Sequence, residues 1–351
     1  MVGAMWKVIV SLVLLMPGPC GGLFHSLYRS VSMPPKGDSG QPLFLTPYIE
    51  AGKIYTGTNS VFQIFPEYKN NDFYVTGESY AGKYVPAIAH LIHSLNPVRE
   101  VKINLNGIAI GDGYSDPESI IGGYAEFLYQ IGLLDEKQKK YFQKQCHECI
   151  EHIRKQNWFE AFEILDKLLD GDLTSDPSYF QNVTGCSNYY NFLRCTEPED
   201  QLYYVKFLSL PEVRQAIHVG NQTFNDGTIV EKYLREDTVQ SVKPWLTEIM
   251  NNYKVLIYNG QLDIIVAAAL TERSLMGMDW KGSQEYKKAE KKVWKIFKSD
   301  SEVAGYIRQV GDFHQVIIRG GGHILPYDQP LRAFDMINRF IYGKGWDPYV
   351  G

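Results

Sequence analysis

A serine, an aspartate and a histidine stand far apart in the chain, each in a local sequence that could expose a reactive side chain. Ser79 follows a β-prone run and lies between Gly77 and Ala81. Small residues two positions on either side allow the sharp strand-to-helix turn that presents a nucleophile. Asp263 follows a run typical of a buried strand, and His323 follows three glycines. These residue types predict acyl transfer by an activated serine.

The three residues would divide the chemistry among them. His323 would take the proton of Ser79, and Asp263 would fix the tautomer of the imidazole and stabilise the imidazolium. The amide of Tyr80, at the start of a helix, could donate to the developing oxyanion. Asp263 also has an ordinary alternative as the N-cap of the helix that follows. Asp112 is a second candidate for the acid, but its Gly-Asp-Gly setting favours a turn residue.

The elements expected around these residues are those of an α/β protein. Strand-like runs cover 72–76, 101–110, 254–260 and 314–318, and helical runs cover 83–92, 118–171, 264–275 and 330–341. Open α/β sheets gather functional residues at the carboxyl ends of their strands. The chain order Ser, Asp, His is that of α/β-hydrolases. The predicted fold is therefore an α/β-hydrolase with a central, mostly parallel sheet.

Two strings resemble one family. Residues 77–86 read Gly-Glu-Ser-Tyr-Ala-Gly-Lys-Tyr-Val-Pro and look like the nucleophile elbow of the serine carboxypeptidases, which are acid-pH exopeptidases. Residues 322–330, Gly-His-Ile-Leu-Pro-Tyr-Asp-Gln-Pro, are similar to the histidine loop of that family. The resemblance implies that Ser79 forms an acyl-enzyme with peptides that have a free C-terminus. It also implies that a protonated Glu78 binds the C-terminal carboxylate of the peptide.

The chain departs from the family ahead of the elbow. The family has two early strands there, and a Gly-Gly-Pro-Gly loop that supplies a second oxyanion donor. That string is absent from this sequence. We interpret the chain as a shortened form of a vitellogenic-like serine carboxypeptidase, with a sheet that is incomplete at its N-terminal strands. Two alternatives stay open, namely a catalytically impaired lumenal binding protein and an esterase or acyltransferase that uses the same triad.

Five segments are expected. They are a signal peptide over 1–22, an extended lead-in over 23–60, a first core part over 61–117, a helical cap with disulfides over 118–207, and a second core part over 208–351. The apolar run in the signal peptide is too short to span a bilayer, and no later stretch is long enough. We therefore expect that the protein does not bind a membrane. We expect that it is secreted or lies in the lysosomal or endosomal lumen.

Composition limits the partners further. The net charge of −5 gives no electrostatic footprint for nucleic acid. His90 and His93 lie three residues apart on a predicted helix, but the glutamate of a metalloprotease helix is missing. We expect no metal ion and no cofactor. A homodimer is the common state in the family that the chain resembles.

The cysteines and sequons suit an oxidising compartment. Cys146, Cys149, Cys186 and Cys195 favour two disulfides over a zinc site, although Cys-x-x-Cys has ligand spacing. Three pairings are possible, and we favour the nested one, 146 with 195 and 149 with 186. The glycosylation acceptors, in loop-like sequence, are Asn182 and Asn221.

Overall fold

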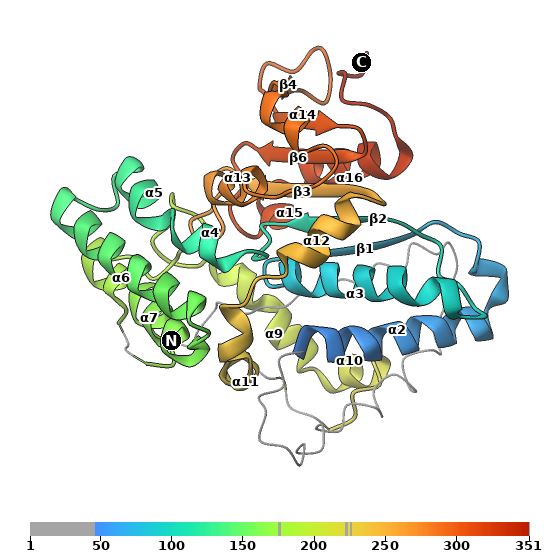
Figure 1. Cartoon of the computed structure of the whole chain (residues 1–351), viewed down its shortest axis with the longest axis horizontal. Coiled ribbons are helices and arrows are strands. Elements are labelled where there is room, and N and C mark those ends of the chain that lie inside the picture. The colour runs from blue at the N-terminus through green and yellow to red at the C-terminus, as the bar shows by residue number, and fades with distance from the viewer. Residues whose placement is uncertain (1–45, 175–176, 222–223, 225–226, 351) are drawn as a thin grey trace.

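The computed structural model describes residues 46–350 except 175–176, 222–223 and 225–226. The predicted signal peptide and most of the predicted lead-in lie outside these residues. Six strands form one sheet in the order β1-β2-β3-β6-β5-β4 (Figure 1). The strands are β1 (Phe73–Glu78), β2 (Leu105–Gly111), β3 (Lys254–Gly260), β4 (Lys292–Trp294), β5 (Gly305–Val310) and β6 (Phe313–Ile318).

The sheet is mostly parallel, as the sequence predicts. β1, β2, β3 and β6 are parallel neighbours, whereas β5 and β4 add an antiparallel edge. Within the described residues β1 pairs only with β2, so the strand that leads to Ser79 lies at the edge of the sheet. That position agrees with a sheet that is incomplete at its N-terminal strands.

Helices lie around this sheet, and some of them lie to one side of it. They are α2 (Thr46–Ile64), α3 (Ala81–Leu95), α4 (Pro117–Ile121), α5 (Tyr124–Gln130), α6 (Glu136–Arg154), α7 (Trp158–Leu169), α8 (Tyr179–Thr184), α9 (Tyr203–Leu208), α10 (Pro211–Ala216), α11 (Thr228–Thr238), α12 (Lys243–Met250), α13 (Ala268–Met276), α14 (Ser283–Lys288), α15 (Leu325–Asp328) and α16 (Pro330–Tyr342). Three short 3₁₀ helices are η2 (Pro66–Tyr68), η3 (Asn96–Val98) and η4 (Glu199–Leu202). None of the helices in the described part is long and apolar enough to cross a bilayer.

Alternate strand residues enter two apolar clusters. Val75 and Val255 pack into the larger cluster, which includes buried side chains of α3 and α12. Their neighbours Tyr74 and Leu256 pack into a smaller cluster with α16. Because successive side chains of a strand point to opposite faces, the two clusters lie on opposite faces of the sheet. The strand ends that carry the site are thus held between two cores.

The start of the described chain corrects one prediction. Residues 46–64 form the helix α2, not an extended lead-in. Tyr55, Thr58 and Phe62 are buried at helical spacing, and α2 packs against α3. The prolines and glycines before residue 46 led us to extend the lead-in too far, although apolar residues recur at helical spacing after the last of those prolines.

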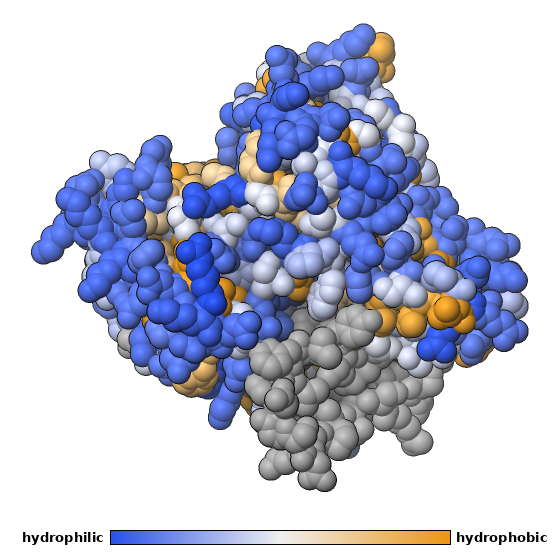
Figure 2. All heavy atoms as spheres, viewed as in Figure 1, coloured by the Kyte–Doolittle hydropathy of each residue, from blue (hydrophilic) through white to orange (hydrophobic). Residues whose placement is uncertain are grey.

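A helical cap is inserted between β2 and β3. Its helices α5, α6 and α7 lie to one side of the sheet, at the left of Figure 1. A capping box starts α6, in which the side chains of Asp135 and Gln138 each accept from the backbone amide of the other. The outer surface of these helices is largely hydrophilic (Figure 2). The helical region continues past residue 207, because α11 packs against α7.

The cysteine pairing differs from the nested prediction. Cys186 is bonded to Cys195, whereas Cys146 and Cys149 are buried free thiols. The last two lie one turn apart on α6, and the Cys149 thiol donates to the carbonyl oxygen of Ala161 at 3.2 Å. They therefore belong to the packed interface of α6 with α7. The nested pairing was wrong because Cys186 and Cys195 are bonded to each other, while Cys146 and Cys149 are buried in the apolar core.

The asparagines of the two sequons are exposed. Asn182 lies in α8, so the prediction of a loop was wrong there, while Asn221 lies in a turn. Both side chains are open to solvent. Glycosylation at these asparagines stays a prediction.

Candidate active site

The backbone at Ser79 has the strained geometry of a nucleophile elbow. Its φ is 63°, in the left-handed region that few residues other than glycine adopt. A Cβ at Gly77 would lie 2.4 Å from the Cβ of Ala81, so a larger residue could not fit. The Ser79 amide donates to the carbonyl oxygen of Gly111 at 2.9 Å, and its own carbonyl accepts from the amide of Tyr114 at 3.0 Å. Contacts with the end of β2 thus hold the serine in this conformation.

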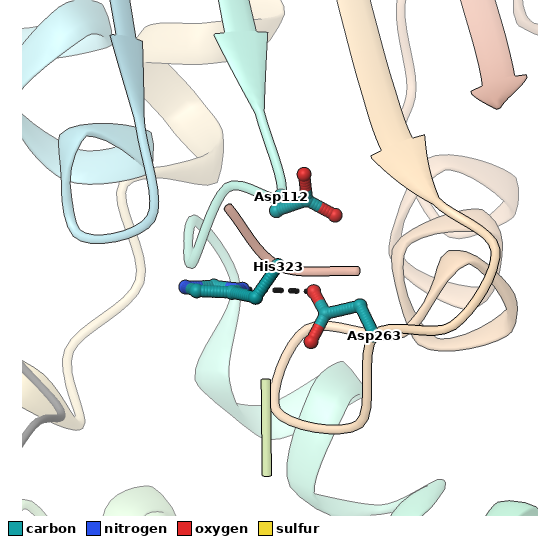
Figure 3. Close-up of side chains that lie close together, drawn as sticks. All are labelled: Asp112, Asp263 and His323. Carbon is teal, nitrogen blue, oxygen red and sulfur yellow. Dashed lines mark hydrogen bonds and ion pairs between the residues drawn. The ribbon is translucent and has the colours of Figure 1, made fainter. Parts of the chain in front are cut away.

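The structure brings the three candidate catalytic residues together. Nε2 of His323 lies 2.8 Å from Oγ of Ser79, and Nδ1 lies 2.9 Å from Oδ2 of Asp263. Figure 3 shows the second of these contacts, between two side chains that come from separate loops. The histidine and aspartate are both buried. The set has the connectivity that a serine hydrolase requires.

The electrostatics of this set favour proton transfer. Burial alone would lower the pKa of His323, but the charge and the hydrogen bond of Asp263 raise it above its usual value. An Nδ1–H that donates to Asp263 leaves Nε2 free to accept from the hydroxyl of Ser79. Asp263 also accepts the amide of Val266 at 3.2 Å. The N-cap alternative was wrong, because α13 begins at Ala268 and its N-cap residue is Ala267.

The histidine loop is fixed by contacts that the sequence did not predict. The amide of His323 donates to the carbonyl oxygen of Tyr190 at 2.7 Å. The amide of Gly322 donates to Oδ2 of Asp328 at 2.7 Å. A Cβ at Gly322 would lie 2.4 Å from the carbonyl oxygen of Tyr190, and a Cβ at Gly260 would lie 2.0 Å from that of Gly322. Glycine is required where these segments meet.

Asp112 lies in the site but does not act as the triad acid. Its φ is 44°, and its Oδ1 accepts from the amide of Gly260 at 2.8 Å. Figure 3 shows it beside Asp263 and His323, with the dashed bond to the imidazole coming from Asp263. Burial, followed by the charges of Asp263 and Glu78, raises the pKa of Asp112 well above its usual value. Asp112 therefore holds the end of β3, from which the loop with Asp263 begins.

Glu78 stands next to the nucleophile at the end of β1. Burial raises its pKa to about 7, and the positive charge of His323 opposes that rise. Its Oε2 is shielded from solvent and has no hydrogen-bond partner among the described residues. In acid solution Glu78 is thus a buried, neutral carboxylic acid.

Tyr80 and Lys83 tie the elbow helix to the rest of the molecule. Tyr80 is the N-cap residue of α3, and its hydroxyl donates to the carboxylate of Asp237 on α11. The buried ammonium of Lys83 lies 3.6 Å from the same carboxylate and donates to the carbonyl oxygen of Gln240 at 2.6 Å. Burial lowers the pKa of Lys83 to about 8, although the charge of Asp237 opposes this. These contacts fix the first turn of α3, where the predicted oxyanion donor lies.

Comparison with known proteins decides the family. The sequence model of the serine carboxypeptidases (Peptidase_S10) matches residues 50–343. This chain belongs to the serine carboxypeptidase family. It is accordingly a serine carboxypeptidase, a hydrolase with the α/β-hydrolase fold.

Its serine carboxypeptidase relatives include a mammalian one of high identity. The chain is 72% identical over 476 positions to the probable serine carboxypeptidase CPVL of Homo sapiens, covering 100% of both. It is 45% identical over 295 residues to the venom serine carboxypeptidase of Apis mellifera, covering 84% of this chain and 62% of the other. The human alignment is 125 positions longer than this chain of 351 residues. The human relative therefore contains residues that this chain lacks.

A solved carboxypeptidase has the same fold. The crystal structure of Kex1Δp, a prohormone-processing carboxypeptidase from Saccharomyces cerevisiae, matches with a TM-score of 0.64 at 19% identity. The match covers 84% of this chain and 67% of that one. At this identity the likeness supports the shared fold.

Proposed function

We propose that this chain releases C-terminal residues from peptides with a free carboxylate, through an acyl-enzyme on Ser79. The observation that carries the proposal is the buried carboxyl of Glu78 beside the nucleophile. With its pKa raised to about 7, this group is neutral in acid solution and can donate a hydrogen bond to a carboxylate. An endopeptidase or an esterase substrate has no negative charge at this position.

Binding the terminal carboxylate would set the point of cleavage. Glu78 and Ser79 are neighbours in the chain, so a peptide held at its terminal carboxylate presents its last peptide bond to the serine. The unpartnered Oε2 of Glu78 gains a partner in that complex. Satisfying a buried polar group in this way favours substrates with a free C-terminus over amidated ones.

The acylation step uses the contacts of the triad. Oγ of Ser79 attacks the carbonyl carbon, and Nε2 of His323 takes the hydroxyl proton across the 2.8 Å contact. Asp263 stabilises the imidazolium, and the amide of Tyr80 would donate to the oxyanion. The C–N bond then breaks as the imidazolium gives its proton to the leaving amine, and the terminal amino acid departs. The remaining peptide stays as an ester on the serine.

Deacylation repeats the proton transfers with water. His323 takes a proton from the water as its oxygen attacks the ester of Ser79, and the second intermediate collapses with return of that proton to Oγ. The products are the shortened peptide and the free enzyme. No step needs a metal ion or a cofactor.

A matched pair of peptides tests this function. The wild-type chain is given a peptide with a free C-terminus and its C-terminally amidated twin at mildly acidic pH. We expect release of the terminal residue from the free acid and much slower release from the amide. Equal rates on the two peptides would favour an esterase or acyltransferase with the same triad. No release from either, by a folded chain, would favour a binding protein.

We further propose that the protein acts in the secretory pathway, in the lysosomal or endosomal lumen or after secretion. The apolar N-terminal segment supports this location, and so does the disulfide between Cys186 and Cys195. Expression in animal cells should give a chain that starts at residue 23. Its electrophoretic mobility should shift on glycosidase treatment. The shift should be smaller in the variants Asn182→Gln and Asn221→Gln. A chain that keeps Met1 and shows no shift would contradict the proposal.

A further inference from the structure

Four carboxylates gather outside the catalytic site, where α7 packs against α11. Asp166 lies on α7, Asp170 is its C-cap, Asp172 follows in the loop and Glu231 lies on α11. One oxygen from each lies within 4.8 Å of the others. Asp166, Asp170 and Glu231 are buried. So many acidic groups inside a protein need a source of positive charge.

The described residues offer few hydrogen-bond donors to these carboxylates. Oδ1 of Asp166, Oδ2 of Asp170 and both carboxylate oxygens of Asp172 are shielded from solvent and have no hydrogen-bond donor. The hydroxyls of Thr174 and Tyr189 donate to other oxygens of Asp166 and Asp170, and the backbone amides of Leu173 and Thr174 also hydrogen-bond Asp166. Among the described residues these three aspartates form no ion pair with a lysine, arginine or histidine. Unpartnered, buried oxygens that lie this close together could serve as ligands of a cation.

We propose that this cluster binds a calcium ion. Calcium takes about six to eight oxygen ligands and tolerates irregular geometry, whereas magnesium demands near-ideal octahedral geometry and usually keeps several waters. Four carboxylates on two helices and a loop therefore suit calcium better than magnesium. The sequence-based expectation of no metal ion is thereby revised. It rested on histidine and cysteine spacings, and Glu231 is joined to the three aspartates only by the tertiary fold.

The cluster is connected to the catalytic residues. Oδ1 of Asp170 accepts from the hydroxyl of Tyr189 at 2.8 Å. The carbonyl oxygen of Tyr189 accepts the amide of Ile265 at 3.1 Å, in the loop that carries the catalytic aspartate. The next residue, Tyr190, stacks on the imidazole of His323. An ion that fixes Asp170 would thus fix the segment that supports both the acid and the base.

Terbium luminescence tests the proposal on the full chain after treatment with a chelator. Because the hydroxyl of Tyr189 contacts Asp170, excitation of tyrosine should give saturable Tb³⁺ emission at pH 7, which excess calcium chloride removes. Asp172→Asn should abolish the emission. The matched control Glu160→Gln, an exposed acid on α7, should leave it unchanged. Emission that persists in Asp172→Asn, or is absent from the wild type, would overturn the proposal.

A second measurement needs no variant and no peptidase activity. Calcium chloride should raise the Tm of the wild-type chain at pH 7, by mass action on the folded state. Magnesium chloride at the same concentration should raise it less. A Tm that does not respond to calcium chloride at pH 7 would overturn the proposal.

Discussion

The ring of Tyr190 lies parallel to the imidazole of His323, with 4.9 Å between the ring centroids and 8° between the planes. Its carbonyl oxygen also accepts the amide of His323 at 2.7 Å. One residue of the cap therefore orients both the backbone and the ring of the catalytic base. The cap therefore forms part of the active site.

Removing this ring should impair turnover. Tyr190→Ala is expected to lower kcat by about 10–100-fold, because a catalytic group displaced by about 1 Å can cost that much. Tyr190→Phe keeps the ring and should stay near wild type. The check is steady-state kinetics of both variants, with the melting temperature measured alongside. An unchanged kcat in a folded Tyr190→Ala protein would mean that the stacking does not position His323.

The protonation of Glu78 should shape the alkaline side of the pH profile. With a pKa of about 7, the neutral acid that binds a carboxylate is lost as pH rises through that value, so kcat/KM should fall there. Glu78→Gln cannot ionise and still offers an N–H donor, so the fall near pH 7 should disappear. Profiles of kcat/KM from pH 4 to 9 for both proteins give the answer. The same alkaline fall in Glu78→Gln would assign it to another group.

Two neighbouring aspartates should respond differently to the same change. Asp263→Asn should lower kcat by about 10⁴-fold, because the carboxylate that orients His323 is lost. Asp112→Asn should stay within a few-fold, since asparagine tolerates a φ of 44° and keeps an acceptor for the amide of Gly260. Assays of both variants on one peptide make the comparison. A large loss in Asp112→Asn with wild-type stability would give that carboxyl a direct part in catalysis.

The cysteine pairing predicts a thiol map. Burial raises the pKa of Cys146 to about 12 and that of Cys149 further still, so neither should react with iodoacetamide in the folded chain. Both should react after unfolding without reductant. Peptide mapping should then find one cross-link, between Cys186 and Cys195. Cross-links of Cys146 to Cys195 and of Cys149 to Cys186 would restore the nested pairing.

Strands buried on both faces could be predicted, whereas the antiparallel edge could not. The apolar run over residues 254–260 became β3 with the same bounds. β5 was missed because only alternate residues near its start are buried, which weakens the apolar signal. A cue existed in Gly311 and Asp312, which connect β5 to β6 as a two-residue turn.

The residues of the site could likewise be predicted only in part. Ser79, Asp263 and His323 stand in local sequences that predict their position at or after strand ends, so spacing and order were sufficient to propose them. Tyr190 and Asp328 act through contacts between distant segments, and no local pattern marks such partners. The predicted disulfide pairing was wrong for a related reason. The number of cysteines and an oxidising compartment predict that disulfides form, but they do not show which cysteines share a helix.

Catalysis requires an assembled triad, although the strand that leads to Ser79 lies at the edge of the sheet. Labelling with a fluorophosphonate probe at mildly acidic pH tests this directly, by intact mass and by mapping of the modified peptide. The wild-type chain should take up one probe at Ser79, and Ser79→Ala should take up none. A folded wild-type chain that shows no labelling, or is labelled equally in Ser79→Ala, would contradict the account.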